Sequence, residues 1–328
     1  MEIRLTEDGR YAYEVLAQDC ACLVRCYGEE RTWHVPETIE GYRIVEAAAY
    51  VFSAGMWQEP FEESERTAGP PACGSAVEEV YFPKTLKKIG RYAFYNCDHL
   101  RVLGLPGTCT DIGGGSFNGS RQYIKELHID DKSGEKSCLK ELLSELSEQM
   151  RVYYSLDGVF LGVLLFPYYY EEAIENTPAR ILEKETHGVG HRYRYCFQNT
   201  QFVFREYDAE RLFYDLQVKE RPQTVLELAL WRLRWPHDCR QDAVERYESY
   251  VRSHLAETVE FLLERTEAKE AQVRGELFRW FVRHPAWNRE DFDMILEALN
   301  RWGRPLEMSL FMEEKGKRFP AKRRSFTF

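Results

Sequence analysis

A stretch that recurs at a constant offset constrains the fold of this chain more than any other feature. Residues 77–99 (VEEVYFPKTLKKIGRYAFYNCDH) align with residues 100–123 (LRVLGLPGTCTDIGGGSFNGSRQY). A third copy begins at residues 124–130, and a looser earlier copy occupies residues 34–52. The coinciding positions are Val80 with Leu103, Phe82 with Leu105, Pro83 with Pro106, Thr85 with Thr108, Ile89 with Ile112, Gly90 with Gly113, and Phe94 with Phe117. A short, regular period of this kind predicts a solenoid, here of about three turns.

Each repeat unit has one apolar side. Val80 and Phe82 alternate with polar residues, as in a short strand with one buried face, and Pro83 ends the strand because proline donates no hydrogen bond to a sheet. Ile89 and Phe94 then return to the same interior. A unit of this size cannot bury its apolar side alone, so successive coils are expected to stack around one shared core.

The same repeat contains Cys97 two residues before His99, a spacing that raises the alternative of a nucleophile with its base. Cys97 aligns with Ser120, directly after the inward phenylalanine, where small and weakly polar residues turn the chain. No third residue that would orient the imidazole is evident. The repeat therefore favours a structural role for Cys97.

These residues carry a family resemblance. The stretch 89–106 (IGRYAFYNCDHLRVLGLP) resembles the BspA-type leucine-rich repeat, and residues 6–52 are similar to the entry hairpin and first coil of that family. The resemblance covers about residues 6–130. It is interrupted by Ala47-Ala48 in place of Ile-Gly and by the insertion 56–76, which is expected to form a mobile surface loop. The resemblance implies a curved solenoid that presents ligands and works as an interaction module.

Composition predicts a cytoplasmic protein without a membrane partner, and the resemblance to the repeat family implies a bacterial one. No run of 18 apolar residues occurs, and charges occupy the region in which a signal peptide would be apolar. Nine cysteines, an odd number, fit reduced thiols. A net charge of −10 argues against bulk nucleic-acid binding. The exception is the tail, with six Lys or Arg between Lys315 and Arg324, for which a solvated tail and a nucleic-acid contact are the alternatives.

The composition changes after the repeats. Five apolar residues at spacings of three and four predict an amphipathic helix over 136–150 that closes the open end of the solenoid: Leu139, Leu142, Leu143, Leu146 and Met150. Asp157-Gly158 between two apolar runs predicts a β-hairpin.

Residues 168–197 form the most polar and aromatic stretch and the best candidate ligand segment. Its candidate residues are Glu171, Glu175, Arg180, His187, His191, Arg192 and Arg194. The glutamates, with Glu172, are expected on a helix, as a solvated face rather than as paired catalytic acids. The two histidines have a zinc-like spacing, but Gly188 and Gly190 disfavour the helix that zinc binding would need. The arginines either reach an acidic partner or phosphate, or pair with the local glutamates.

The last third of the chain has helical periodicity. Helices are predicted over 224–235, over 242–266 as one helix or two with a break near Ser253, and around 273–281 with a stop near His284-Pro285. Asn288 is a candidate cap for the next helix, and Gly303 and Pro305 separate it from residues 306–315. The stretch 291–315 weakly resembles ankyrin-like helix pairs.

These observations predict an α+β chain with three parts: a leucine-rich-repeat β-solenoid (1–130), a small mixed segment with a capping helix, a hairpin and a polar-aromatic connector (131–220), and an all-α helical-repeat domain with a basic tail (221–328). Two repeat regions without a catalytic constellation favour a non-catalytic scaffold that binds an unknown protein, with no cofactor and no metal. Self-association and an enzyme or phosphate binder using residues 170–195 are the alternatives. The residues predicted to contact the partner are Tyr81, Tyr92, Tyr95 and Arg101.

Overall fold

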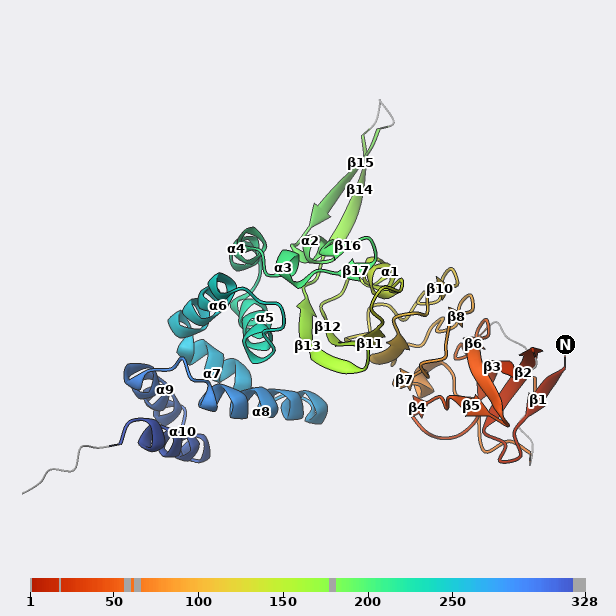
Figure 1. The fold of residues 1–328 in the computed structure, drawn as a ribbon, viewed down its shortest axis with the longest axis horizontal. Helices are drawn as coiled ribbons and strands as arrows, with labels where there is room; N and C mark the ends of the chain where they lie inside the picture. Colours follow the sequence, from red (N-terminus) through yellow and green to blue (C-terminus); the bar gives the residue numbers. More distant parts are fainter. Residues whose placement is uncertain (1, 18, 56–59, 62–65, 177–180, 321–328) are drawn as a thin grey trace, which may run out of the picture. The chain divides into compact units, whose positions relative to one another are not determined.

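The structure is a computed structural model that describes residues 2–17, 19–55, 60–61, 66–176 and 181–320. It divides into two compact units, Met1–Tyr207 and Asp208–Phe328 (Figure 1). The two compact units meet at one boundary, between Tyr207 and Asp208. The three-part division predicted from the sequence, with boundaries at residues 131 and 221, remains a prediction.

Two sheets made mostly of parallel strands form the solenoid in the first unit. The first sheet begins with the antiparallel strands β1 (Ile3–Leu5) and β2 (Tyr11–Ala17) and continues through β3 (Cys20–Cys26), β6 (Tyr42–Ala47), β8 (Lys88–Ile89) and β10 (Asp111–Ile112), with β5 (Thr38–Ile39) beside β6. The second sheet has the order β4 (Thr32–His34), β7 (Glu79–Tyr81), β9 (Val102–Pro106), β11 (Glu126–Asp131), β12 (Met150–Leu156) and β13 (Val159–Phe166). Each coil contributes one short strand to each sheet, as its two apolar edges require.

The strand register confirms the predicted repeat. Val80 pairs with Leu103 and Ile89 with Ile112, so residues that coincide in the repeat alignment lie side by side in the sheets. The rings of Phe52, Phe94 and Phe117 stack through the core, with centroids 5.6 and 5.7 Å apart and planes within 5° of parallel. The solenoid has about five turns, more than the three predicted, because the looser first coils and the strand after α1 continue the same sheets.

The end of the solenoid differs in detail from the prediction. Helix α1 spans only Leu139–Glu145 and lies beside residues 112–117, next to β10, the last strand of the first sheet. The second sheet continues after this helix with β12 and β13, so α1 does not close the whole end of the solenoid. Leu146 is buried beyond its end, and Met150 begins β12 instead of ending the helix, because its backbone pairs in the sheet. The hairpin between β12 and β13 is confirmed, with positive φ angles of 52° at Asp157 and 78° at Gly158.

The insertion at 56–76 lies partly outside the described residues. Its later part is held on the first hairpin: the amide of Ala68 donates to the carbonyl of Gly9 (3.0 Å) and that of Ala72 to the carbonyl of Cys26 (2.8 Å). Residues 68–72 are thus attached to the solenoid by backbone hydrogen bonds, and the prediction of a mobile loop is untested for residues 56–59 and 62–65.

A second hairpin and short helices complete the first unit. Strands β14 (Tyr170–Asn176) and β15 (Ile181–His187) form a separate two-stranded antiparallel sheet, followed by α2 (Gly190–Tyr193), the strand pair β16 (Phe197–Gln198) and β17 (Gln201–Phe202), and α3 (Phe204–Tyr207). The prediction that the glutamates near residue 172 lie on a helix is therefore wrong, because their segment pairs as a strand. A short helix also forms at Gly190, where none was expected.

Helices alone form the second unit. They are α4 (Glu210–Lys219), α5 (Pro222–Arg234), α6 (Gln241–Ser253), α7 (Leu255–Leu263), α8 (Ala268–Arg283), α9 (Arg289–Arg301) and α10 (Pro305–Arg318). The predicted break near Ser253 is confirmed, and Asn288 caps α9 in a reciprocal capping box with Asp291. Helix α4 was not predicted, and the ankyrin-like assignment remains a prediction. No helix among the described residues has the length and apolar character needed to cross a membrane.

Candidate functional site

A row of aromatic rings crosses the outer face of the second sheet. Side chains alternate between the two faces of a strand, so Val80, which is buried, directs its neighbour Tyr81 outward. The strand register places His34, Tyr81, His128 and Tyr153 side by side across the sheet. His34 stacks on Tyr81 with centroids 4.6 Å apart, Tyr81 meets His128 edge to face at 5.4 Å, and His128 stacks on Tyr153 at 4.5 Å.

Gly104 makes this row continuous. It occupies the register position between Tyr81 and His128 and contributes no side chain. A Cβ atom at Gly104 would lie 2.5 Å from Cδ1 of Tyr81, closer than atoms can approach. The glycine at position 104 therefore leaves room for the Tyr81 ring to cross β9 and contact His128. The backbone φ angle of Gly104 lies outside the region that favours glycine, so the need for glycine here is steric.

A groove of about 370 Å³ runs along one side of this row. The rings of Tyr81, His128 and Tyr153 form one wall, and Pro106 contributes to the lining. Lys84 and Asp130, paired at 3.2 Å, lie at the ends of the strands together with Phe160, whose side chain is 40% exposed. Aromatic walls with few polar groups are suited to hold apolar side chains of a ligand.

The charged groups beside the row are already engaged. The Tyr81 hydroxyl donates to the Glu79 carboxylate at 3.0 Å, and partial burial together with this carboxylate raises the pKa of Tyr81 well above its ordinary value. Glu126 lies 3.5 Å from Arg151 and 3.8 Å from His128. Tyr81 therefore stays protonated at physiological pH, and the site offers ring surfaces and hydrogen bonds but no activated nucleophile among its described residues.

The structure separates the four residues predicted to contact a partner. Tyr81 lies in the row, whereas Tyr92 and Tyr95 contact each other in the turn after β8, where Tyr92 stacks on Tyr50 with centroids 5.3 Å apart. Arg101 is exposed directly before β9. The sequence analysis did not identify His34, His128, Tyr153 or Phe160. In the repeat alignment Tyr81 coincides with Gly104, which has no ring, so the return of aromatic residues at His128 and Tyr153 was not recognised.

In the candidate ligand segment, Arg194 is buried and engaged. Its guanidinium donates to the carbonyls of Leu146 (3.1 Å), Pro167, Gly190 (3.0 Å) and Glu148 (2.7 Å). Burial lowers the pKa of Arg194 to about 10, so it remains charged at physiological pH. Arg194 joins loops of the first unit and contacts backbone carbonyls rather than the glutamate carboxylates that the sequence suggested.

The two histidines of the segment each approach a glutamate. Nε2 of His187 lies 3.4 Å from the Glu172 carboxylate, and Nε2 of His191 lies 3.8 Å from the Glu171 carboxylate. The His187 ring also stacks on Tyr170, with centroids 4.5 Å apart. Within the described part of the chain, no group of three or more His, Cys, Asp or Glu side chains is placed to hold a metal ion.

The remaining predicted residues of the segment lie elsewhere. Arg192 is exposed on α2. Glu175 is part of β14, opposite Leu182, but its side chain lies outside the described part of the structure, as does the whole of Arg180. The described members thus gather around the base of the hairpin.

The Cys97 thiol has a structural environment. Its Sγ donates to the carbonyl of Phe52 at 3.1 Å, and burial raises the pKa of the Cys97 thiol to about 12. The ring of His99 instead contacts the carbonyl of Ser75 through Nδ1 at 2.9 Å. The alternative of a nucleophile with its base is therefore wrong, because this thiol stays protonated and the imidazole engages another group.

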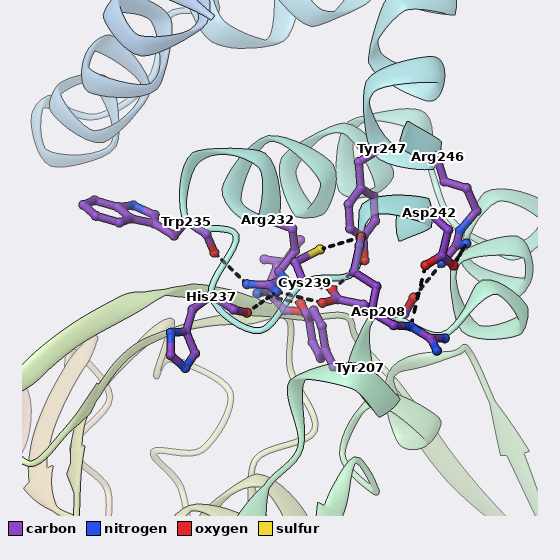
Figure 2. Close-up of polar contacts among 11 residues, drawn as sticks. Tyr207, Asp208, Arg232, Trp235, His237, Cys239, Asp242, Arg246 and Tyr247 are labelled. Atoms are coloured by element: carbon purple, nitrogen blue, oxygen red, sulfur yellow. Dashed lines mark hydrogen bonds and ion pairs between the residues drawn. The ribbon is translucent and has the colours of Figure 1, made fainter. Parts of the chain in front are cut away.

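A buried ion pair stabilises the second unit and is its most conspicuous polar feature. Asp208 accepts two hydrogen bonds from Arg232, at 2.8 and 2.7 Å, and a third from the Tyr247 hydroxyl at 2.8 Å (Figure 2). Arg232 also donates to the carbonyls of Trp235 and His237. These bonds connect α5, α6 and the loop between them, so the cluster is structural.

Comparison with known proteins identifies the central coils. Residues 73–148 match the family model whose description is "BspA type Leucine rich repeat region (6 copies)". Residues 73–148 are a BspA-type leucine-rich repeat region. The match contains Gly104 and the row residues Tyr81 and His128, whereas His34 and Tyr153 lie on the flanking strands. Leucine-rich-repeat solenoids typically mediate protein–protein interactions.

Two solved structures resemble the chain at low identity. A leucine rich cell surface protein from Faecalibacterium prausnitzii is 15% identical, over 49% of this chain and 44% of that one, with a TM-score of 0.28. The Leucine Rich Repeat protein of T. pallidum is 16% identical, over 48% of this chain and 85% of that one, with a TM-score of 0.21. This chain thus spans less than half the length of the first of these proteins, and no curated protein matches it.

Proposed function

We propose that the chain is a non-catalytic protein-binding scaffold that holds its partner on the outer face of the second solenoid sheet. The observation that supports this proposal is the continuous aromatic row beside the 370 Å³ groove. Tyrosine contributes large contact area at a low cost in conformational entropy and is enriched among the residues that dominate binding energy.

The pairing of the sheet decides how a partner is recognised at this surface. The inner strands β7, β9, β11 and β12 each pair on both sides, so their backbone groups have no free edge to offer a partner strand. Recognition therefore takes place through side chains above the sheet. Tyr81, Tyr153 and Phe160 are the proposed anchors, with Lys84 and Asp130 as the polar rim.

Substitutions in the row test this proposal. Partner capture from a cell lysate, quantified for the wild-type chain and for Tyr153→Ala and Gly104→Ala, is expected to fall at least tenfold for both variants, because each removes or displaces a ring of the row. Tyr92→Ala is the matched control, since Tyr92 lies in a turn outside the groove. Capture of the same protein in equal amounts by all four chains would overturn the assignment of this face.

The alternatives of an anionic ligand and of a nucleic acid have less support. A phosphate binder using residues 170–195 would need several cationic side chains together at the surface. Arg192 is exposed on α2, but Arg194 is occupied by four carbonyls and Lys184 approaches the Glu171 carboxylate at 3.5 Å. The described cations of the basic tail, Lys315, Lys317 and Arg318, each pair with an acidic side chain. Lys322, Arg323 and Arg324 lie outside the described residues, so a nucleic-acid contact there remains a prediction.

A further inference from the structure

The hairpin formed by β14 and β15 is acidic and shares no residue with the groove. Its two strands contain five glutamates and one lysine, a formal charge of −4 over 14 residues. Figure 1 shows the hairpin extending away from the rest of the first unit, and among the described residues each of its strands pairs only with the other. An isolated two-stranded sheet is marginally stable in water and gains stability from a third partner.

One face of this hairpin combines aromatic rings with opposed carboxylates. Tyr170 lies opposite His187, and two residues further along each strand Glu172 lies opposite Glu185. Alternate residues of a strand share a face, so these four residues form one surface, here called the hairpin face. Like charges directly opposite each other destabilise an antiparallel pair of strands, so the pairing of Glu172 with Glu185 does not help the hairpin to fold.

Two basic side chains lie near the carboxylates of this hairpin. Nε2 of His187 lies 3.4 Å from the Glu172 carboxylate and 4.0 Å from the Glu185 carboxylate, and makes no hydrogen bond with either. Lys184 belongs to the opposite face, where it approaches Glu171 at 3.5 Å. Glu172 and Glu185 are 57% and 60% exposed, so both carboxylates remain open to a cation from outside the chain.

The base of the hairpin adds exposed aromatic surface. Tyr168, Tyr170 and Tyr195 are 41%, 44% and 62% exposed, and Tyr168 and Tyr170 contact each other with centroids 6.0 Å apart. An ammonium or guanidinium group above a tyrosine ring is attracted by the ring quadrupole. Rings and carboxylates at neighbouring positions therefore suit the same cationic side chain.

We propose that the hairpin face docks an extended, arginine- or lysine-bearing segment of a partner protein. A cation of the segment lies between Glu172 and Glu185 and against the Tyr170 ring, and the segment pairs with a free edge of the hairpin as a third strand. Charge complementarity selects this occupant, because the four residues of the face include two carboxylates and no lysine or arginine.

The experiment uses the full-length chain and a fluorescent peptide of alternating threonine and arginine, with a peptide in which glutamine replaces each arginine as the control. Fluorescence anisotropy at physiological salt measures both affinities. The arginine peptide is expected to bind, and the double variant Glu172→Gln/Glu185→Gln is expected to bind it at least tenfold more weakly. Tyr170→Leu is expected to weaken binding several-fold, whereas Tyr170→Phe keeps the ring and leaves binding within twofold.

The matched control is Glu297→Gln/Glu313→Gln, which removes the same charge from exposed helix positions of the second unit and is expected to change the affinity less than twofold. Amide hydrogen exchange of β14 and β15 shows whether the hairpin of the double variant remains formed, as expected from the loss of like-charge repulsion. Equal weakening by both double variants, or equal binding of the glutamine peptide, would overturn the proposal. Partner capture at the groove is expected to be unchanged in these variants, so the two proposals fail independently.

Discussion

Three buried arginines show how single side chains hold the irregular segments of this chain. Arg25 donates through one nitrogen to the carbonyls of Tyr50, Val51 and Ser53, and Arg194 and Arg232 bind the carbonyls of their own surrounding loops. Loops leave carbonyls without partners in a sheet or helix, and the five donors of a guanidinium can satisfy several of them at once. A lysine side chain at these positions would lack the planar guanidinium group and its five donors.

The ion pair of Asp208 and Arg232 gives the largest expected effect of a single charge. Asp208→Asn leaves a buried guanidinium without its counter-ion, and we expect the free energy of unfolding of the second unit to fall by about 3–5 kcal/mol. Urea denaturation followed by tryptophan fluorescence measures the change. Asp242→Asn is the control: its carboxylate is 57% exposed and pairs with Arg246, so a loss below about 1 kcal/mol is expected. Similar losses in both variants would contradict the role assigned to Asp208.

His284 is expected to make the second unit less stable in acid. Burial lowers the pKa of His284 below its ordinary value of 6.5, despite the opposing effect of Glu248 at 3.1 Å. Arg318 and Arg252 act in the same direction as burial. The unfolded chain then binds the proton more readily than the folded chain, so the free energy of unfolding falls as the pH drops below about 6.5.

Urea titrations at pH 7.5 and pH 5 test this effect, with Trp280 and Trp287 beside the imidazole as fluorescent reporters. His284→Gln is expected to show a smaller loss of stability between the two pH values than the wild-type chain. An unchanged pH dependence would show that another group is responsible.

At the scale of the element, the stack of Phe52, Phe94 and Phe117 joins successive coils through one ring each. The ring of Phe94 is fully buried between the other two rings. Backbone amides in the turns of Phe52 and Phe94 donate hydrogen bonds to backbone carbonyls in the next turn, along the direction of the ring stack. The stack and the hydrogen bonds therefore hold the coils in the same register, which makes Phe94 the residue on which the stacking of three coils depends.

Phe94→Ala is expected to lower the free energy of unfolding of the first unit by about 3–5 kcal/mol, because a ring-sized cavity opens where both neighbouring coils are already in contact. Chemical denaturation followed by circular dichroism gives the value. Phe160→Ala removes a ring that is 40% exposed and is expected to cost far less. A loss for Phe94→Ala no greater than for Phe160→Ala would show that the coils do not depend on this stack.

Sequence reasoning succeeded for elements whose signal recurs or is local. The coils were found because Val80, Ile89 and Phe94 each have a counterpart one repeat later, and the β12–β13 hairpin because Asp157-Gly158 fixes its turn. Strands β14 and β15 were missed because a stretch rich in glutamate has high helix propensity, whereas cross-strand pairing, a non-local interaction, decides its conformation.

The candidate site was only partly predictable for a related reason. Tyr81 was identified, but the row also depends on Gly104, an absent side chain, and on His34 and Tyr153 from coils outside the clearest repeats. Three of the four carbonyls that bind Arg194 belong to distant loops, so its burial likewise left no local trace in the sequence. Sequence periodicity reports which side a residue faces, but it does not report which neighbours meet it there.

At the scale of the molecule, the division into Met1–Tyr207 and Asp208–Phe328 assigns each stabilising cluster to one compact unit. Phe94 belongs to the solenoid and Asp208 to the helical unit, so the two substitutions remove interactions that involve different residues. Substitutions without shared partners usually have additive effects, within about 0.5 kcal/mol.

Hydrogen exchange measured by mass spectrometry tests this separation. Phe94→Ala is expected to accelerate amide exchange in peptides of residues 2–207 and to leave those of the helical unit unchanged, and Asp208→Asn is expected to do the reverse. Faster exchange in both units from either single substitution would show that the units unfold together.

The equivalence of the coils also makes the length of the solenoid adjustable in discrete steps. A duplicate of residues 77–99 inserted after His99 would present Val80, Ile89 and Phe94 to a preceding and a following coil that already accept them. Each added copy would lengthen the stack by one strand spacing, about 4.8 Å, and leave both ends as they are. The number of coils therefore sets the distance between the hairpin of β1 and β2 and helix α1.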